Sequence, residues 1–307
     1  MRNNSSVFQF GLISDIHKDV IHDADGRLRT FIQSAQTNQV DFILQMGDFC
    51  IPIPENLPFL DIWYQFEGPK YHVLGNHDMD GDGHQKPDGA YAFTPEETMT
   101  FWGMPTRYYA FDHAGVHFII LDGNDKPVDP SGYYEYIAPD QIDWLKSDLT
   151  NTDLPVIIFC HQNLARQDGL VNQPEVHAVF DGANKQVGKS KIIACFTGHD
   201  HRDYVRQLDG IIYAQINSAS YHWLGGDYIC QRYSQKIDVQ YPYIKYTLPY
   251  RNALYAIVTV NMAERFIKIE GIESEFVGPP PWELDDTPKN LDTESLNPAI
   301  SGWQLSF

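Results

Sequence analysis

The chain has 307 residues, of which 43% are hydrophobic, and this is enough to bury a substantial core. It carries 41 acidic against 22 basic side chains, a formal net charge of −19, so we expect neither nucleic acid nor a membrane as partner. No apolar run approaches the roughly 20 residues that span a bilayer. The first six residues are polar and show no signal peptide, which slightly favours the cytoplasm and leaves open an export signal already removed.

Six short apolar runs, rich in Ile, Val and Phe, predict buried β-strands in the first two thirds of the chain. They cover residues 7–13, 40–46, 70–74, 116–121, 154–160 and 191–196. Three stretches between them predict helices, at residues 27–36, 95–102 and 139–149. Because strands and helices alternate, we expect an α/β fold around a central, partly parallel sheet.

Beyond Gly198 the runs predict strands joined by hairpins, with Asp209-Gly210 as a turn signal. These runs cover residues 204–208, 211–216, 243–248, 253–260 and 265–269. We expect one domain over residues 1–275, with a cap-like insertion at about 79–108 that is rich in Gly, Asp and Pro. Residues 276–307 have little periodicity, so we interpret them as an irregular, Pro-rich tail. The tail either lies on the domain through Trp282, Trp303 and Phe307 or is disordered.

Five of the predicted strands end in residues of the types that bind metal ions. These residues are Asp15 and His17 after the first run, Asp48 after the second, Asn76 after the third, His161 after the fifth, and His199 and His201 after the sixth. Sites in α/β sheets form in the crevice beyond the carboxyl ends of the strands, so we expect these side chains to gather there. The spacing in Asp15/His17 and His199/His201 places both members of each pair on one side of an extended segment. Glycines precede Asp48, Asn76 and His199 and allow the tight turns that bring these side chains in.

Each motif is weak alone, but the order DxH, GDxx, GNHD, lone His, GHxH resembles the calcineurin-like metallophosphoesterase family from Asp15 to His201. The resemblance implies a four-layer α-β-β-α sandwich of two packed mixed sheets flanked by helices. It also implies hydrolysis of phosphoric mono- or diesters at a centre of two metal ions. The implied ligands are Asp15, His17 and His201 for the first ion, Asn76, His161 and His199 for the second, and Asp48 as the bridge. Histidine and carboxylate ligands suit Mn, Fe or Zn and do not choose among them.

The resemblance also implies a mechanism. Two metal ions hold a bridging hydroxide in line with phosphorus and supply the local positive charge that the acidic chain otherwise lacks. His77, next to Asn76, is implied to be the general acid that protonates the leaving oxygen, with Asp78 holding its ring and raising its pKa. Cys50 stands where many relatives carry Asp or Tyr, which argues against the Tyr ligand of purple acid phosphatases.

We expect substrate contacts from Asn76, His161, His199 and Tyr221, and a supporting role for Asn217 behind the ligands. The aromatic clusters Tyr133–Tyr136 and Tyr221–Trp223 either pack on neighbouring loops or form a wall that stacks on an organic leaving group. Because the loops offer aromatic rather than basic residues, we expect a small organic phosphate as substrate.

Two other functions stay open at this stage. One is a catalytically silent scaffold of the same fold that binds proteins. The other is a nuclease, which the acidic balance and the lack of a Lys/Arg cluster disfavour. The sequence does not distinguish monoesters from diesters and does not indicate an oligomeric state.

Overall fold

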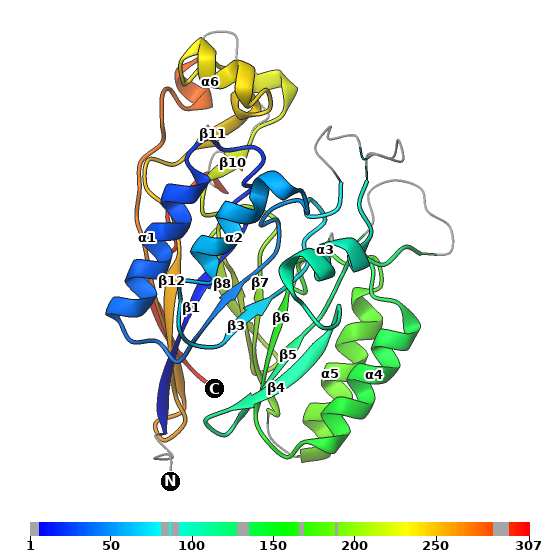
Figure 1. The fold of residues 1–307 in the computed structure, drawn as a ribbon. Helices are drawn as coiled ribbons and strands as arrows, with labels where there is room; N and C mark the ends of the chain where they lie inside the picture. The colour runs from blue at the N-terminus through cyan, green and yellow to red at the C-terminus, as the bar shows by residue number, and fades with distance from the viewer. Residues whose placement is uncertain are drawn as a thin grey trace.

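The computed structural model describes residues 6–80, 86, 92–127, 135–165, 169–187, 190–284 and 295–307. Two six-stranded mixed sheets pack face to face, and helices cover their outer faces (Figure 1). This arrangement confirms the predicted four-layer α-β-β-α sandwich. Among the described residues, no helix combines the length and the apolar character needed to cross a membrane.

The first sheet has the strand order β14-β13-β12-β1-β2-β3. Its strands are β1 (Val7–Ile13), β2 (Phe42–Gln45), β3 (Lys70–His72), β12 (Ala256–Asn261), β13 (Phe266–Gly271) and β14 (Trp303–Ser306). The central strand β1 is parallel to β2 and antiparallel to β12. Helices α1 (Ala24–Thr37) and α2 (Leu57–Trp63) cover the outer face, where Phe31 and Trp63 are fully buried.

The second sheet has the strand order β4-β5-β6-β7-β9-β8. Its strands are β4 (Tyr109–His113), β5 (Val116–Ile120), β6 (Val156–Cys160), β7 (Ile192–Thr197), β8 (Tyr204–Leu208) and β9 (Ile211–Gln215). The four inner strands are parallel, and an antiparallel strand closes each edge. Helices α4 (Pro139–Asn151) and α5 (Gln173–Val187) cover the outer face.

The core between the sheets is built largely from phenylalanine. The ring of Phe10 on β1 lies 6.0 Å from that of Phe118 on β5 and 5.9 Å from that of Phe159 on β6. Side chains alternate along β2, so Phe42 faces this core while Ile43 packs under the helices of the first sheet. Both faces of the strand are therefore buried, which explains its continuous apolar sequence.

Smaller elements lie beyond one end of the sandwich, at the top of Figure 1. They are the paired strands β10 (Tyr221–Trp223) and β11 (Thr247–Pro249) and the short helix α6 (Gln235–Gln240). Helix α3 (Pro95–Trp102) starts with a capping box formed by Thr94 and Glu97. Short 3-10 turns occupy Pro54–Asn56, Gly226–Tyr228, Ile244–Tyr246 and Pro281–Glu283.

Two sequence-based expectations need correction. The predicted strand at residues 243–248 is a 3-10 turn followed by β11, because Tyr243 and its neighbours turn to meet β10 instead of extending. The tail is not irregular throughout, since β14 pairs with β13 and extends the first sheet. Trp303 and Phe307 pack against the core, as the first interpretation of the tail requires. Much of the predicted cap, residues 81–85 and 87–91, and the tail residues 285–294 lie outside the described residues.

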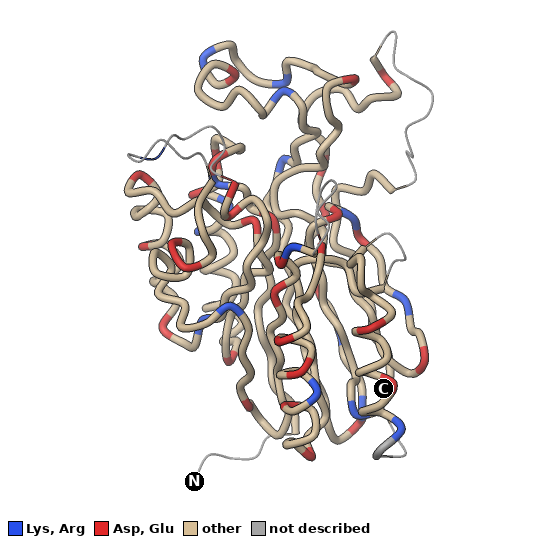
Figure 2. Tube along the Cα trace, turned by 90° about the vertical axis from the view of Figure 1, so that its right-hand side faces the viewer, with Lys and Arg blue, Asp and Glu red and all other residues tan. Residues whose placement is uncertain are grey.

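The charged side chains are predominantly acidic. Lys and Arg positions lie scattered among more numerous Asp and Glu positions along the described trace (Figure 2). A phosphate anion therefore meets a repulsive surface unless positive charge is supplied locally.

Candidate metal centre

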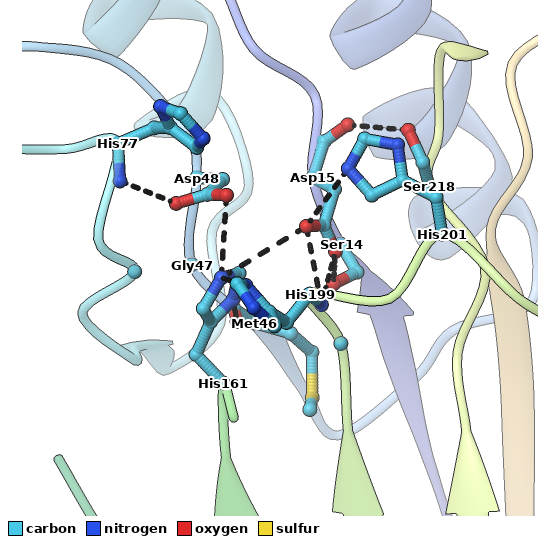
Figure 3. Close-up of polar contacts among 12 residues, drawn as sticks. Ser14, Asp15, Met46, Gly47, Asp48, His77, His161, His199, His201 and Ser218 are labelled. Atoms are coloured by element: carbon cyan, nitrogen blue, oxygen red, sulfur yellow. Dashed lines mark hydrogen bonds and ion pairs between the residues drawn. The ribbon is translucent and has the colours of Figure 1, made fainter. Parts of the chain in front are cut away.

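The loops that follow five parallel strands bring the predicted ligands together at one end of the sandwich. Ligand atoms of Asp15, His17 and His201 all lie within 4.8 Å of one another. Those of Asp48, His161 and His199 form a second group of the same kind. In Figure 3 the labelled Asp and His side chains of the two groups point toward a common space. These two groups contain the six predicted ligands that are histidines or carboxylates; the seventh, Asn76, is an amide and is considered below.

Five of these ligand residues have a left-handed backbone, which non-glycine residues seldom adopt. Their φ angles are 52° at Asp15, 52° at His17, 51° at Asp48, 72° at His199 and 50° at His201. The expectation of an extended segment for the two pairs is therefore wrong, because both pairs lie beyond the ends of their strands. Backbone hydrogen bonds hold this conformation, from Asp15 N to Gly47 O at 3.0 Å and from His17 N to Asp48 O at 2.9 Å. Such strain persists only where the surroundings fix it and is common at functional sites.

The glycines before three ligands are required by close packing. A Cβ atom on Gly47 would lie closer than 3.0 Å to the imidazole of His161, and one on Gly75 would meet Asp48 just as closely. A Cβ on Gly198 would lie closer than 3.0 Å to Asp15. The glycines therefore let the ligand loops approach one another, and Gly47 also has a φ of 98°.

Hydrogen bonds to backbone carbonyls set the tautomers of two histidines. Nδ1 of His161 donates to the carbonyl of Met46, and Nδ1 of His201 donates to the carbonyl of Tyr221, both at 2.8 Å. Nε2 of each ring is then the atom that faces a carboxylate. It lies 3.2 Å from Asp48 Oδ2 for His161 and 3.3 Å from Asp15 Oδ1 for His201. In the neutral ring this tautomer offers a lone pair to a metal ion, which would take the place of the second proton.

Sequence reasoning missed Glu135, which contacts the ligand histidine His199. Nδ1 of His199 lies 3.2 Å from Nε2 of His161, and Nε2 of His199 lies 3.1 Å from Glu135 Oε1. A carboxylate hydrogen-bonded to the ring nitrogen that does not face the metal ion fixes the orientation of a ligand histidine and makes the other nitrogen a stronger metal ligand. No sequence pattern indicates this role, because Glu135 belongs to the segment GYYEY, in which the tyrosines are the prominent feature.

The buried carboxylates of Asp15 and Asp48 lie among imidazoles and need positive charge. Burial raises the pKa of Asp15, but His161 and His201 outweigh it and lower this pKa to about 2. Burial lowers the pKa of His161, and the carboxylates of Asp48 and Asp15 more than reverse this, raising it to about 10. The pKa of His17 falls to about 3 because the ring is fully buried. Two carboxylates thus remain charged in a buried site.

A family model for calcineurin-like phosphoesterases matches residues 8–203, nearly two thirds of the chain. The chain belongs to this family. The match contains all five motifs, and the geometry described above is the spatial arrangement of those motifs. The family depends on metal ions and comprises phosphoesterases together with members that lack catalysis.

Solved structures share the fold. A dimetal phosphatase from Danio rerio is 16% identical with a TM-score of 0.58, over 88% of this chain and 98% of that one. GAP50, described as the anchor in the inner membrane complex of Plasmodium, is 14% identical with a TM-score of 0.50, over 89% of both chains. A search of curated proteins gives no match to this chain.

The donor set fits the metal ions on which this family depends. It combines buried carboxylates with imidazoles whose lone pairs face them, as Mn, Fe and Zn prefer. The side-chain oxygen of Asn76 is buried and has no hydrogen-bond partner among the described residues. A buried oxygen of this kind costs free energy unless a partner is provided, and a cation is such a partner.

His77 lies beside the bridging position that is predicted for Asp48. Its backbone N–H donates to Asp48 Oδ1 at 2.8 Å, and its side chain is 43% exposed. Nδ1 of the ring forms an ion pair with Asp80. Asp80, three residues along the chain, thus has the role that the sequence assigned to Asp78.

The expectation that Asp78 holds the ring of His77 is wrong. The carboxylate of Asp78 is completely buried and accepts hydrogen bonds from four backbone N–H groups. The donors are Gly75 at 2.8 Å, Asp48 at 2.9 Å, Phe49 at 2.6 Å and Cys50 at 3.1 Å. Burial, and then the carboxylate of Asp48, raise the pKa of Asp78 well above its usual value. Asp78 therefore ties together the loops that carry Asp48 and Asn76.

Asn217 supports the C-terminal segment, and none of its hydrogen bonds among the described residues reaches a predicted ligand. Its amide donates to the carbonyls of Asn297 at 2.7 Å and Ala299 at 3.0 Å. The next residue, Ser218, has the supporting role, since its hydroxyl donates to the carbonyl of Asp15 at 2.8 Å. The backbone N–H of Ser218 donates in turn to Asn217 Oδ1 at 2.8 Å, so Asn217 contacts the residue that holds Asp15.

A cavity of about 470 Å³ opens over the metal centre. Its lining includes His17, Asp48 and His77 together with the aromatic residues Trp223 and Tyr243. Tyr221 also lines it but is almost fully buried, with its ring 5.0 Å from the ring of His17. Tyr133 and Tyr134, from the other predicted aromatic cluster, lie outside the described residues.

Proposed function

We propose that this protein hydrolyses phosphoric esters of small organic molecules at a two-metal centre, with His77 as the general acid. The observation that carries the proposal is the position of Asp48 between the two ligand groups. Oδ2 of Asp48 lies 3.6 Å from His17 Nε2 in the first group and 3.2 Å from His161 Nε2 in the second. A carboxylate in that position is suited to bridge two ions.

The protein side of the chemistry follows from the described residues. The first ion would be held by Asp15, His17 and His201, the second by Asn76, His161 and His199, and Asp48 would be shared. When bound, the two ions polarise the phosphate and activate water at neutral pH.

His77 is suited to proton transfer by its position and by its partner. Its side chain lines the cavity, and the ion pair with Asp80 at Nδ1 leaves the transferable proton on Nε2. Asp48 accepts from the backbone N–H of His77, so the proposed acid is tied to the proposed bridge. The acid thus keeps a fixed position relative to the reacting phosphate.

The substrate class is inferred from the cavity. A volume of about 470 Å³ is in the range of small-molecule sites, roughly 300–1,000 Å³. The scattered cations of this acidic chain offer no track for a nucleic acid backbone. A small phosphoric ester therefore suits the site better than a polynucleotide.

The test combines metal analysis with hydrolysis of p-nitrophenyl phosphate and bis-p-nitrophenyl phosphate. The protein is stripped with a chelator and then reloaded with Mn²⁺, Zn²⁺ or Fe²⁺. We expect about two ions per chain and hydrolysis that returns on reloading. The ratio of the two rates separates monoesterase from diesterase. Full metal loading with no hydrolysis of either compound would contradict the proposal and favour a silent scaffold.

A further inference from the structure

Two large aromatic side chains remain exposed in the cavity over the metal centre. Trp223 is 47% and Tyr243 is 41% exposed, and both line this cavity with His77. Exposed aromatic surface costs free energy when it faces only water, and in a concave site it is a usual contact for a ligand. Neither ring is used by the metal ligands or by the proposed acid.

The two rings are held in place by a hydrogen-bonded framework. Trp223 is paired with Thr247 across β10 and β11, and its indole stacks on Tyr246 with ring centroids 5.9 Å apart and planes 12° apart. The backbone N–H of Leu224 donates to the carbonyl of Tyr246 at 2.9 Å. The ring of Tyr243 lies 6.4 Å from that of Tyr246. A ligand stacking here would find aromatic surface that is already ordered.

The same framework is fixed relative to the metal centre. Nδ1 of His201 donates to the carbonyl of Tyr221, and Nδ1 of His222 donates to the carbonyl of His201 at 2.9 Å. Strand β10 is therefore bonded twice to a residue of the first ligand group. Trp223 is the next residue of that strand, so its position is tied to the position of the phosphate.

The segment of the chain that carries the two rings also differs in charge from the rest of the sequence. Residues 221–251 contain four basic and two acidic side chains, while the whole chain has a formal net charge of −19. The ammonium group of Lys245 lies 5.7 Å from the ring centroid of Tyr246, the ring that supports Trp223. This segment is therefore less repulsive to an anionic substrate than the chain as a whole.

We propose that Trp223 and Tyr243 form a stacking platform for a flat aromatic ring in the leaving group of the substrate. The substrate class is then a phosphoric ester whose alcohol bears an aromatic ring. This inference rests on the proposed function, because the platform and the metal centre share one cavity. It predicts selectivity for ring flatness, since stacking requires two planar faces.

The test compares 2-phenylethyl phosphate with 2-cyclohexylethyl phosphate in the manganese-loaded protein. The two alcohols are nearly equal in acidity and size, and apolar burial alone favours the cyclohexyl compound. We expect a kcat/KM roughly three- to tenfold higher for the phenyl ester, from the ordinary strength of aromatic stacking. In Trp223→Ala and in the double variant with Tyr243→Ala, this ratio should fall to about one. Trp282→Ala is the matched control, because Trp282 is 50% exposed and does not line this cavity, and it should keep the ratio.

Equal kcat/KM for the two esters in the wild type, or a ratio that survives in both variants, would overturn the platform. A second arm separates this from a failure of the proposed function. Calorimetry measures binding of the non-hydrolysable 2-phenylethyl and 2-cyclohexylethyl phosphonates. If no ester is hydrolysed, the proposed function fails. The platform is still supported in that case if the phenyl phosphonate binds more tightly than the cyclohexyl one and Trp223→Ala abolishes this preference. Equal binding of the two phosphonates, or none, overturns it.

Discussion

Glu135 Oε1 lies 3.1 Å from Nε2 of His199, while Nδ1 of the same ring faces His161. The imidazole is thus held from outside by a carboxylate at the nitrogen that faces away from the other ligands. Glu135 Oε2 is buried and has no hydrogen-bond partner among the described residues. The free energy of keeping this carboxylate buried is best offset by a charged partner, which a metal-bound imidazole provides.

We therefore predict that Glu135→Ala lowers metal affinity by roughly 10- to 100-fold. Glu135→Gln should lose less, because an amide oxygen still accepts the hydrogen bond from Nε2. Isothermal titration calorimetry of the metal-free protein with Mn²⁺ measures the metal affinity of both variants. Glu264→Gln, at an exposed position, is the control and should bind as the wild type does. Unchanged affinity in Glu135→Ala would show that His199 needs no external support.

Substitutions of Asp78 and Asp80 form a matched pair whose expected effects on stability differ greatly in size. Asp78→Ala removes the acceptor of four buried backbone N–H groups, and each unsatisfied donor costs about 1–3 kcal/mol. We expect the free energy of unfolding to fall by about 3 kcal/mol or more, measured by urea denaturation. Asp80→Ala, at an exposed position, should change it by less than about 0.5 kcal/mol. Equal losses in the two variants would contradict the assignment of Asp78 as the loop tie.

His77→Ala should reduce kcat by roughly 10²- to 10⁴-fold, because the leaving oxygen then departs without a proton donor. Metal content, measured on the same sample, should stay at the wild-type level. Asp80→Asn should lower kcat less, since it removes the partner of the ring and leaves the ring itself. Near-normal turnover in His77→Ala would show that the proton comes from elsewhere.

A pH dependence of stability is expected far from the metal centre, at His117 on β5. Its Nδ1 lies 2.6 Å from Asp112 on β4, and its Nε2 lies 2.7 Å from Asp148 on α4. The hydrogen bond to Asp148, and then the one to Asp112, raise the pKa of His117 above its usual value against the effect of burial. A raised pKa means that the folded state binds the proton more tightly. This stabilisation is complete below about pH 6.5, the ordinary histidine pKa, and is lost as the pH rises through the raised value.

The measurement is the difference in unfolding free energy between wild type and His117→Gln at pH 6 and at pH 9, with equal metal loading. We expect the advantage of the wild type to shrink at the higher pH. Other titrating groups cancel in this difference, because both proteins carry them. An advantage that is constant over this range would show that His117 is uncharged in the folded protein.

The parts of the fold that follow from local chemistry were predictable from the sequence. Continuous apolar runs identified β1, β6 and β7 because both faces of these strands are buried. The ligand positions could be predicted because the order of five motifs matches the family pattern, although each motif by itself is weak. Helix α2 was missed because its sequence LPFLDIW is apolar on most sides and shows no helical period.

The features that sequence reasoning missed depend on tertiary contacts. The left-handed backbone at Asp15 is fixed by hydrogen bonds between loops. Local strand and turn propensities do not predict such hydrogen bonds. The exchange of roles between Asp78 and Asp80 has a similar origin. Both are acidic residues close to His77, and only the packing of the loop around Asp48 decides which of them is buried.

The position of β1 between β2 and β12 has a consequence for how the chain folds. One edge of β1 pairs with residues 42–45 soon after both are made, but the other edge waits for residues 256–261. At ordinary rates of synthesis this interval lasts roughly tens of seconds. Throughout it, a strand carrying Phe8, Phe10 and Leu12 presents an open edge to other chains. The loop with Asp15 follows this same strand. We therefore expect newly made protein to bind metal ions only after the hairpin of β12 and β13 has been synthesised and has paired with β1.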